Sequence, residues 1–107
     1  MTANPWRGEV ALTIDGQPQR MRLTLGALAE LEAELEGGTL VDLVRRFEGG
    51  SCSTRDVLAL IVAGLRGGGW RGSAADLLSA EIEGGPLGAA EAAAQLLARA
   101  FMAPGDA

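Results

Sequence analysis

The beginning of the chain alternates apolar with more polar residues, and this alternation stops at Leu23. A period of two is expected of a strand that buries one face and exposes the other. Asp15-Gly16 divides the stretch in two and is a turn signal. The pattern therefore predicts a β-hairpin over residues 7–24. The apolar positions of this hairpin are Val10, Leu12, Ile14, Met21 and Leu23.

The register of the hairpin depends on Pro18. Proline cannot donate a ladder hydrogen bond, so we expect Pro18 to lie in the loop and not in the second strand. This choice sets Leu12 opposite Met21. It also sets Val10 opposite Leu23. A two-stranded hairpin is marginally stable alone, so it must pack on other elements, and its edges are candidates for strand addition to a neighbouring subunit.

A helical pattern begins at Thr24, where apolar residues start to recur every three or four positions. Three later helix starts place an aspartate three positions after a hydroxyl residue, an arrangement that caps free backbone amides. Glycine pairs and a glycine triplet follow the helices and end them, because glycine adopts positive φ easily. Pro86 suits the first turn of a final helix over about 86–102. The three capping boxes are Thr39–Asp42, Ser53–Asp56 and Ser73–Asp76.

These elements predict an α+β fold that is mostly α, with the N-terminal β-hairpin packed on a bundle of about five short helices in residues 25–102. The chain has 107 residues, of which 48% are apolar, and this suffices for one core. We therefore expect a single domain over residues 1–107. The closing residues 103–107, APGDA, are expected to form a flexible tail.

The charge of the chain narrows the choice of partners. The formal net charge is −5, so there is no broad basic surface for phosphates, and nucleic acid is not an expected partner. The N-terminus lacks a signal sequence and no apolar run is long enough to cross a membrane, so we expect a cytoplasmic protein. Cys52 is the only cysteine, which excludes an intrachain disulfide and leaves it as a small apolar filler or loop residue.

Candidate chemistry is sparse. The chain contains no histidine, the commonest general base and transition-metal ligand. Gly67, Gly69 and Gly72 match the spacing of a dinucleotide fingerprint, but a helix and not a strand is predicted before them. Glu30 and Glu34 are one helical turn apart and fit a solvated acidic face better than a carboxylate pair or a cation site. We therefore expect no enzymatic activity, no cofactor and no metal.

The two tryptophans are the best candidates for partner binding. Trp6 precedes the hairpin and Trp70 lies in the glycine-rich connection, so no regular element requires either to be buried. Each either covers an edge of the core or contacts a partner, since exposed tryptophan is favoured in interfaces. Arg71 and Phe47 complete the set of candidate partner-binding residues. The helices themselves are expected to form the core, although a small bundle can leave one groove open for a partner helix.

The order of several motifs resembles one family. The chain is similar to the small tail proteins of gene transfer agents, the phage-like particles of alphaproteobacteria, and of related siphophage-type prophages. The resemblance extends from Asn4 to about Phe101. Its motifs are Asn4-Pro5, the run RGEV from Arg7, the turn Asp15-Gly16, LTLGALAELE from Leu23, RFEGG from Arg46 and AGLRGGG from Ala63.

Members of that family have been labelled both as tail tube proteins and as tail assembly chaperones. A siphophage tube subunit is similar to a β-sandwich, which needs many alternating strands, whereas this sequence predicts two. The resemblance therefore implies a tail assembly chaperone that binds the tape measure protein or other tail proteins and can self-associate into a homo-oligomer. The alternative is a structural tail tube or connector subunit of the particle.

Overall fold

The computed structural model of the protein describes residues 8–35 and 38–101. Several predicted features fall on residues outside these ranges. They are the first hairpin residue at position 7, the candidate Trp6, Glu36-Gly37 at the end of the first helical stretch, residue 102 and the tail at 103–107.

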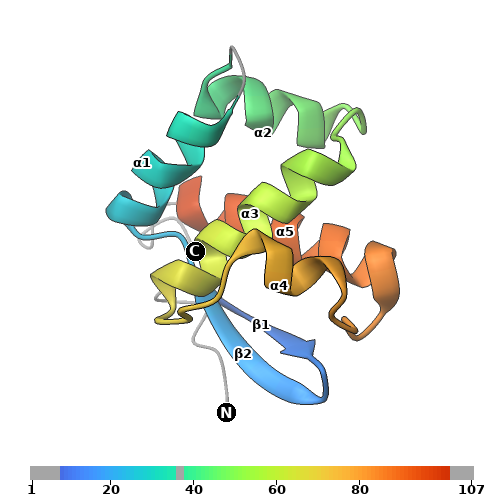
Figure 1. The fold of residues 1–107 in the computed structure, drawn as a ribbon. Coiled ribbons are helices and arrows are strands. Elements are labelled where there is room, and N and C mark those ends of the chain that lie inside the picture. Colours follow the sequence, from blue (N-terminus) through green and yellow to red (C-terminus); the bar gives the residue numbers. More distant parts are fainter. Residues whose placement is uncertain (1–7, 36–37, 102–107) are drawn as a thin grey trace.

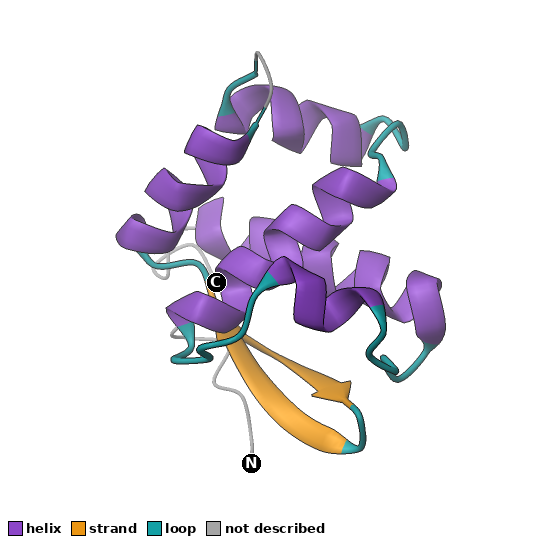
Figure 2. Cartoon of the chain, viewed as in Figure 1, coloured by secondary structure: helices purple, strands orange, loops and turns teal. Residues whose placement is uncertain are grey.

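The described residues form a two-stranded antiparallel sheet followed by helices, so the predicted α+β class with mostly helical content is confirmed (Figures 1 and 2). The hairpin lies at one end of the molecule, against the two longest helices, at residues 54–67 and 85–101. The elements in order are β1 (Glu9–Ile14), β2 (Gln17–Arg22), α1 (Leu25–Glu34), α2 (Leu40–Glu48), α3 (Thr54–Gly67), α4 (Ala74–Leu78) and α5 (Gly85–Phe101).

The hairpin turn consists of Asp15 and Gly16, whose φ angles are 51° and 77°. Positive φ at both central residues is typical of a type I′ turn, which matches the twist of the two strands. The predicted register is wrong by two residues, because β2 begins at Gln17, directly after this tight turn. Val10 is opposite Met21, and Leu12 is opposite Gln19.

The predicted register is wrong because Pro18 was expected in the loop. This proline lies within β2, opposite Thr13. Ile14 and Gln17 are the pair that closes the two-residue turn. The next pair, Thr13 and Pro18, is therefore a non-hydrogen-bonded pair. At this position the backbone nitrogen of β2 points away from β1. Proline on the outward side of an edge strand therefore costs no ladder hydrogen bond.

Helix α3 is the centre of the fold (Figure 1). It contacts β2, α1, α4 and α5, while α5 covers β1 as well. The apolar face of the hairpin packs on α3 and α5, so the alternation seen in the sequence becomes one side of the core. The side chains with less than 2% exposed surface are Met21, Leu31, Leu43, Leu60, Ile61, Leu65 and Leu96.

Both outer edges of the hairpin contact the same chain. On the β1 side, Ile82 forms an isolated bridge with Ile14, and the Glu83 amide donates to the Thr13 carbonyl at 3.0 Å. On the β2 side, α3 approaches the backbone so closely that a Cβ on Gly67 would lie 1.9 Å from the Arg22 carbonyl oxygen. These contacts argue against strand addition to a neighbouring subunit at the same places.

The helix starts follow the capping chemistry expected of them. The Thr24 hydroxyl accepts from the amide of residue 27 at the start of α1. The capping boxes at the starts of α2 and α3 are confirmed. At α4 the Asp76 carboxylate accepts from the Ser73 amide at 2.8 Å, while the Ser73 hydroxyl donates to the same carboxylate. Within the described part of the chain, no helix is both long and apolar enough to cross a bilayer.

Candidate functional site

An apolar groove lies between α3, α4 and the beginning of α5. Its volume is about 480 Å³. Mostly aliphatic side chains line it, with a few small polar residues at one end where α3 begins. We call it the α3–α5 groove. It is lined by Cys52, Ser53, Thr54, Val57, Leu58, Ile61, Leu77, Leu78, Ala80, Ile82, Gly85, Pro86, Ala89 and Ala90.

The groove exists because its walls differ in side-chain size. Val57, Leu58 and Ile61 recur at helical spacing along α3 and form the floor. The wall from α5 is shallow, because Ala89 and Ala90 have short side chains. Opposite them, α4 has only five residues, too few to cover the length of α3. The result is an apolar depression that the described part of the chain does not fill.

The two leucines of α4 line this groove but differ in their exposure to solvent. Leu77 is buried and joins the core, whereas Leu78 lines the groove with 75% of its surface exposed. An exposed leucine is common on protein surfaces, but here it extends an apolar depression. This combination is typical of a surface that binds another apolar surface.

The groove has few polar side chains, and one of them already serves a helix cap. The Ser53 hydroxyl accepts from the amide of Asp56 at 3.1 Å as part of the α3 cap. Cys52 is a free, half-buried thiol. A pocket for a small polar molecule normally offers several convergent polar groups. The α3–α5 groove lacks such convergence among its lining residues, so its chemistry favours an apolar occupant.

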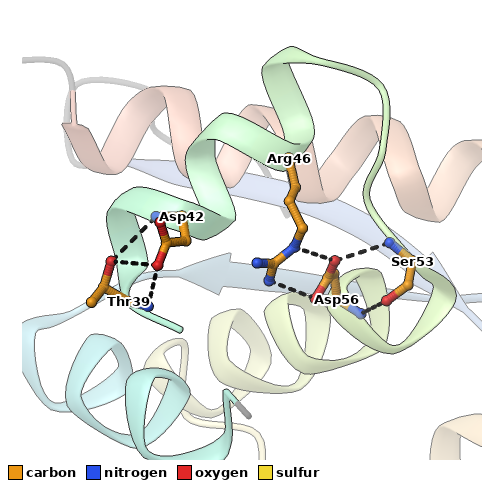
Figure 3. Close-up of polar contacts among 5 residues, drawn as sticks. All are labelled: Thr39, Asp42, Arg46, Ser53 and Asp56. Atoms are coloured by element: carbon orange, nitrogen blue, oxygen red, sulfur yellow. Dashed lines mark hydrogen bonds and ion pairs between the residues drawn. The ribbon is translucent and has the colours of Figure 1, made fainter. Parts of the chain in front are cut away.

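A charged contact braces the other side of α3 (Figure 3). The guanidinium of Arg46 on α2 donates two hydrogen bonds to the Asp56 carboxylate, both at 2.9 Å. Asp56 also accepts from the Ser53 amide at 2.9 Å, so one carboxylate caps α3 and binds α2. The hydrogen bonds from Arg46, followed by that from the Ser53 amide, hold the pKa of Asp56 below its usual value of 3.8, although burial opposes the shift. The sequence predicted the cap at Ser53–Asp56 but not its ion pair with Arg46.

The candidate partner-binding residues do not form one site. Trp70 is half-buried against the core at the C-terminal end of α3, and Arg71 beside it is exposed. Phe47 is half-buried in the last turn of α2, which precedes the start of α3. The 14-residue α3, about 20 Å long, separates these two places.

The indole of Trp70 has a defined environment. A Cβ on Gly72 would lie 2.1 Å from the ring, so the ring packs directly on this glycine. The Trp70 amide donates to the Leu65 carbonyl at 2.9 Å, which fixes the chain after α3. This packing agrees with the reading of Trp70 as a cover for the core edge.

The glycine-rich segment and the acidic residues carry no catalytic arrangement. Gly67 ends a helix, as predicted, so the spacing of the dinucleotide fingerprint lacks its strand. Glu30 is exposed, and its carboxylate oxygen Oε2 lies 3.7 Å from the guanidinium nitrogen Nη1 of Arg66. Over residues 8–35 and 38–101, no group of three or more histidine, cysteine, aspartate or glutamate residues is placed to hold a metal ion.

The groove residues are the functional candidates that the sequence reading did not single out. Leu77, Leu78 and Ile82 come from a short helix and a connection, where no long periodic pattern marks them. The available signal was the pair of adjacent leucines in a helix too short to bury both. The small residues of α5 were a second signal, since they allow close approach of a neighbouring helix.

Comparison with known proteins identifies a family. The profile of the family described as "Phage tail tube protein, GTA-gp10" matches residues 7–103. Neither the curated proteins nor the solved structures give a significant match. The matched range contains the hairpin and every residue of the α3–α5 groove.

Proposed function

This chain belongs to the phage tail tube protein GTA-gp10 family, and we propose that within phage tail assembly it acts as a tail assembly chaperone for the tape measure protein. In this role it would bind apolar helical segments of the tape measure protein in the cytoplasm before the tail tube polymerises. Such a function requires reversible binding and no catalysis. Other tail proteins are further candidate partners because of the family.

The observation that carries this proposal is the α3–α5 groove. It is open, apolar and bordered by the exposed Leu78. An amphipathic helix places its apolar residues in such a groove at positions i, i+3, i+4 and i+7. Reversible coverage of those residues would keep a long apolar-faced protein from aggregating.

The second candidate is a structural tail tube or connector subunit, which the description of the family favours. A tube lined by sheets needs strands with edges that continue into the next subunit. The described residues form one two-stranded sheet, and both of its edges contact the same chain. These features support the chaperone proposal over the tube proposal.

Co-expression with the tape measure protein of the same particle tests the chaperone proposal. We expect the soluble fraction of the tape measure protein to rise and a complex to co-purify. The chain alone and the tape measure protein alone are the controls. Unchanged solubility with no complex would show that the client assignment is wrong.

The composition of mature particles separates the two candidates. A chaperone leaves before the particle is complete, so quantitative mass spectrometry should find this chain far below the abundance of the tail proteins. A structural subunit would be present in stoichiometric amounts. The latter result would establish the tube or connector role.

A further inference from the structure

We propose that the α3–α5 groove selects a client helix that carries lysine or arginine beside its apolar stripe. This inference rests on the proposed chaperone function and adds the chemistry of the segment that is bound. It follows from the charges around the groove and from the length of its floor.

Acidic side chains border the groove at the connection before α5. Glu81 and Glu83 flank Ile82, which lines the groove. Both glutamates line an adjoining cavity that shares Ala80, Ile82 and Gly85 with the groove, so they lie where the groove continues toward the hairpin. Both are exposed, and neither forms an ion pair with another described residue.

Two more acidic residues are sequence neighbours of lining residues. Glu91 directly follows Ala90 and is exposed, whereas Asp76, which directly precedes Leu77, already caps α4 through Ser73. Arg55 adjoins the lining at Thr54, and it already interacts within the chain. The lining itself contains no charged residue. An apolar floor with an acidic border is complementary to a helix with an apolar stripe and a basic flank.

The floor also limits the length of the bound stripe. The lining residues of α3 run from Thr54 to Ile61, which corresponds to about 10 Å along the helix. A client helix would therefore place about two turns of apolar residues in the groove. Basic residues one position outside this stripe would lie beside Glu81 and Glu83.

A second copy of this chain is a weaker match for the groove. Each copy has a formal net charge of −5, so two copies repel each other at an acidic border. A basic client helix is attracted to the same border. The charge balance therefore favours a different protein as the occupant.

The test uses overlapping peptides of 20 residues that cover the tape measure protein of the same particle. Binding to the full chain is measured by fluorescence anisotropy. Occupancy of the groove is measured separately by the reaction rate of Cys52 with a maleimide, because this lone cysteine lines the groove. We expect binding peptides to combine an apolar stripe with lysine or arginine, and to slow the modification of Cys52.

Two variants probe the two halves of the proposal. Leu78→Glu places a charge on the apolar wall and should weaken binding by about tenfold or more. The double variant Glu81→Lys and Glu83→Lys should weaken it by about tenfold and remove most of its salt dependence. All three side chains are exposed, so the fold should tolerate the changes.

Matched controls lie away from the groove. Leu25→Glu changes a leucine that is 85% exposed at the start of α1. Glu34→Lys with Glu48→Lys changes the net charge by the same amount as the double variant, on exposed positions of α1 and α2. Neither control should alter peptide affinity by more than about twofold.

Each contrary outcome overturns a defined statement. If peptides bind but leave the modification rate of Cys52 unchanged, the client binds outside the groove. If neutral or acidic peptides bind as well as basic ones, the groove does not select a basic flank. A groove occupied by a second copy would appear as a dimer that Leu78→Glu dissociates, and it would also contradict this inference. The chaperone proposal itself fails if neither the peptides nor the intact tape measure protein binds.

Discussion

Arg46 on α2 and Asp56 on α3 form a two-pronged ion pair, with both donor–acceptor distances at 2.9 Å. The pair joins α2, whose Leu43 is completely buried in the core, to the helix at the centre of the fold. Its side chains retain 33% and 12% of their exposed surface, respectively, so water screens the pair only in part. The same carboxylate caps α3, so two structural functions depend on one residue.

The first prediction concerns the stability supplied by this carboxylate. Asp56→Ala removes the cap and leaves the Arg46 guanidinium without its partner, so the free energy of unfolding should fall by about 2–3 kcal/mol. Urea denaturation followed by circular dichroism measures the change. Asp42→Ala, which removes the exposed cap of α2, is the control and should have a clearly smaller effect. Equal effects would mean that the ion pair adds nothing.

The second prediction is a pH dependence with a defined sign. The pKa of Asp56 is lowered in the folded state, chiefly by hydrogen bonds from Arg46, so the folded protein binds this proton less readily than the unfolded chain. The stabilisation is therefore complete above the usual value of 3.8 and is lost as the pH falls through the lower folded value. Unfolding experiments from pH 6 down to pH 2 should show a steeper loss for the natural chain than for Asp56→Asn. Parallel curves for the two proteins would contradict the assignment.

The third prediction compares two glycines. Gly67→Ala would place a methyl group 1.9 Å from the Arg22 carbonyl oxygen, so α3 and β2 must separate and stability should fall by about 2–3 kcal/mol. Gly26→Ala on α1 meets no atom closer than 3.9 Å and should raise stability by about 0.5 kcal/mol, because alanine favours helix. Thermal unfolding of both variants checks the contrast. A Gly67→Ala protein as stable as the natural chain would show that the close approach is not required.

The fourth prediction separates folding from binding at Trp70. Because the indole packs on Gly72 and on the core, Trp70→Ala should lower the free energy of unfolding by about 2 kcal/mol. Its affinity for the tape measure protein, measured below the unfolding temperature, should stay within about twofold. Trp70→Phe is the control and should recover part of the stability. Normal stability with lost affinity would instead identify Trp70 as a partner contact.

Much of the fold was accessible from the sequence because its determinants are local. The alternation before Leu23 and the caps at Thr39 and Ser53 depend on residues within four positions of one another. The hairpin register was missed because the tolerance of Pro18 depends on which side of an edge strand it occupies. The length of the turn determines which side Pro18 occupies, so the proline alone does not reveal the register.

The features that were not predicted join distant parts of the chain. Arg46 and Asp56 are ten positions apart and meet only when α2 folds back on α3. The α3–α5 groove combines residues from three helices and two connections, and none of these segments is unusual by itself. Gly67 and Gly68 were read as a helix end, and the structure adds their close contact with the β2 backbone.

The contacts that cover the β1 edge join residues that are far apart in the sequence. The Asp15 carboxylate accepts from the Glu81 amide 66 positions later, and Arg99 donates to the Glu9 carbonyl 90 positions later. Contacts of such long sequence separation form late, because the intervening chain must first lose its freedom. During synthesis, the apolar face of the hairpin therefore leaves the ribosome long before α5 is available to cover it. The hairpin is synthesised first, and we expect its packing on the rest of the chain to be completed last.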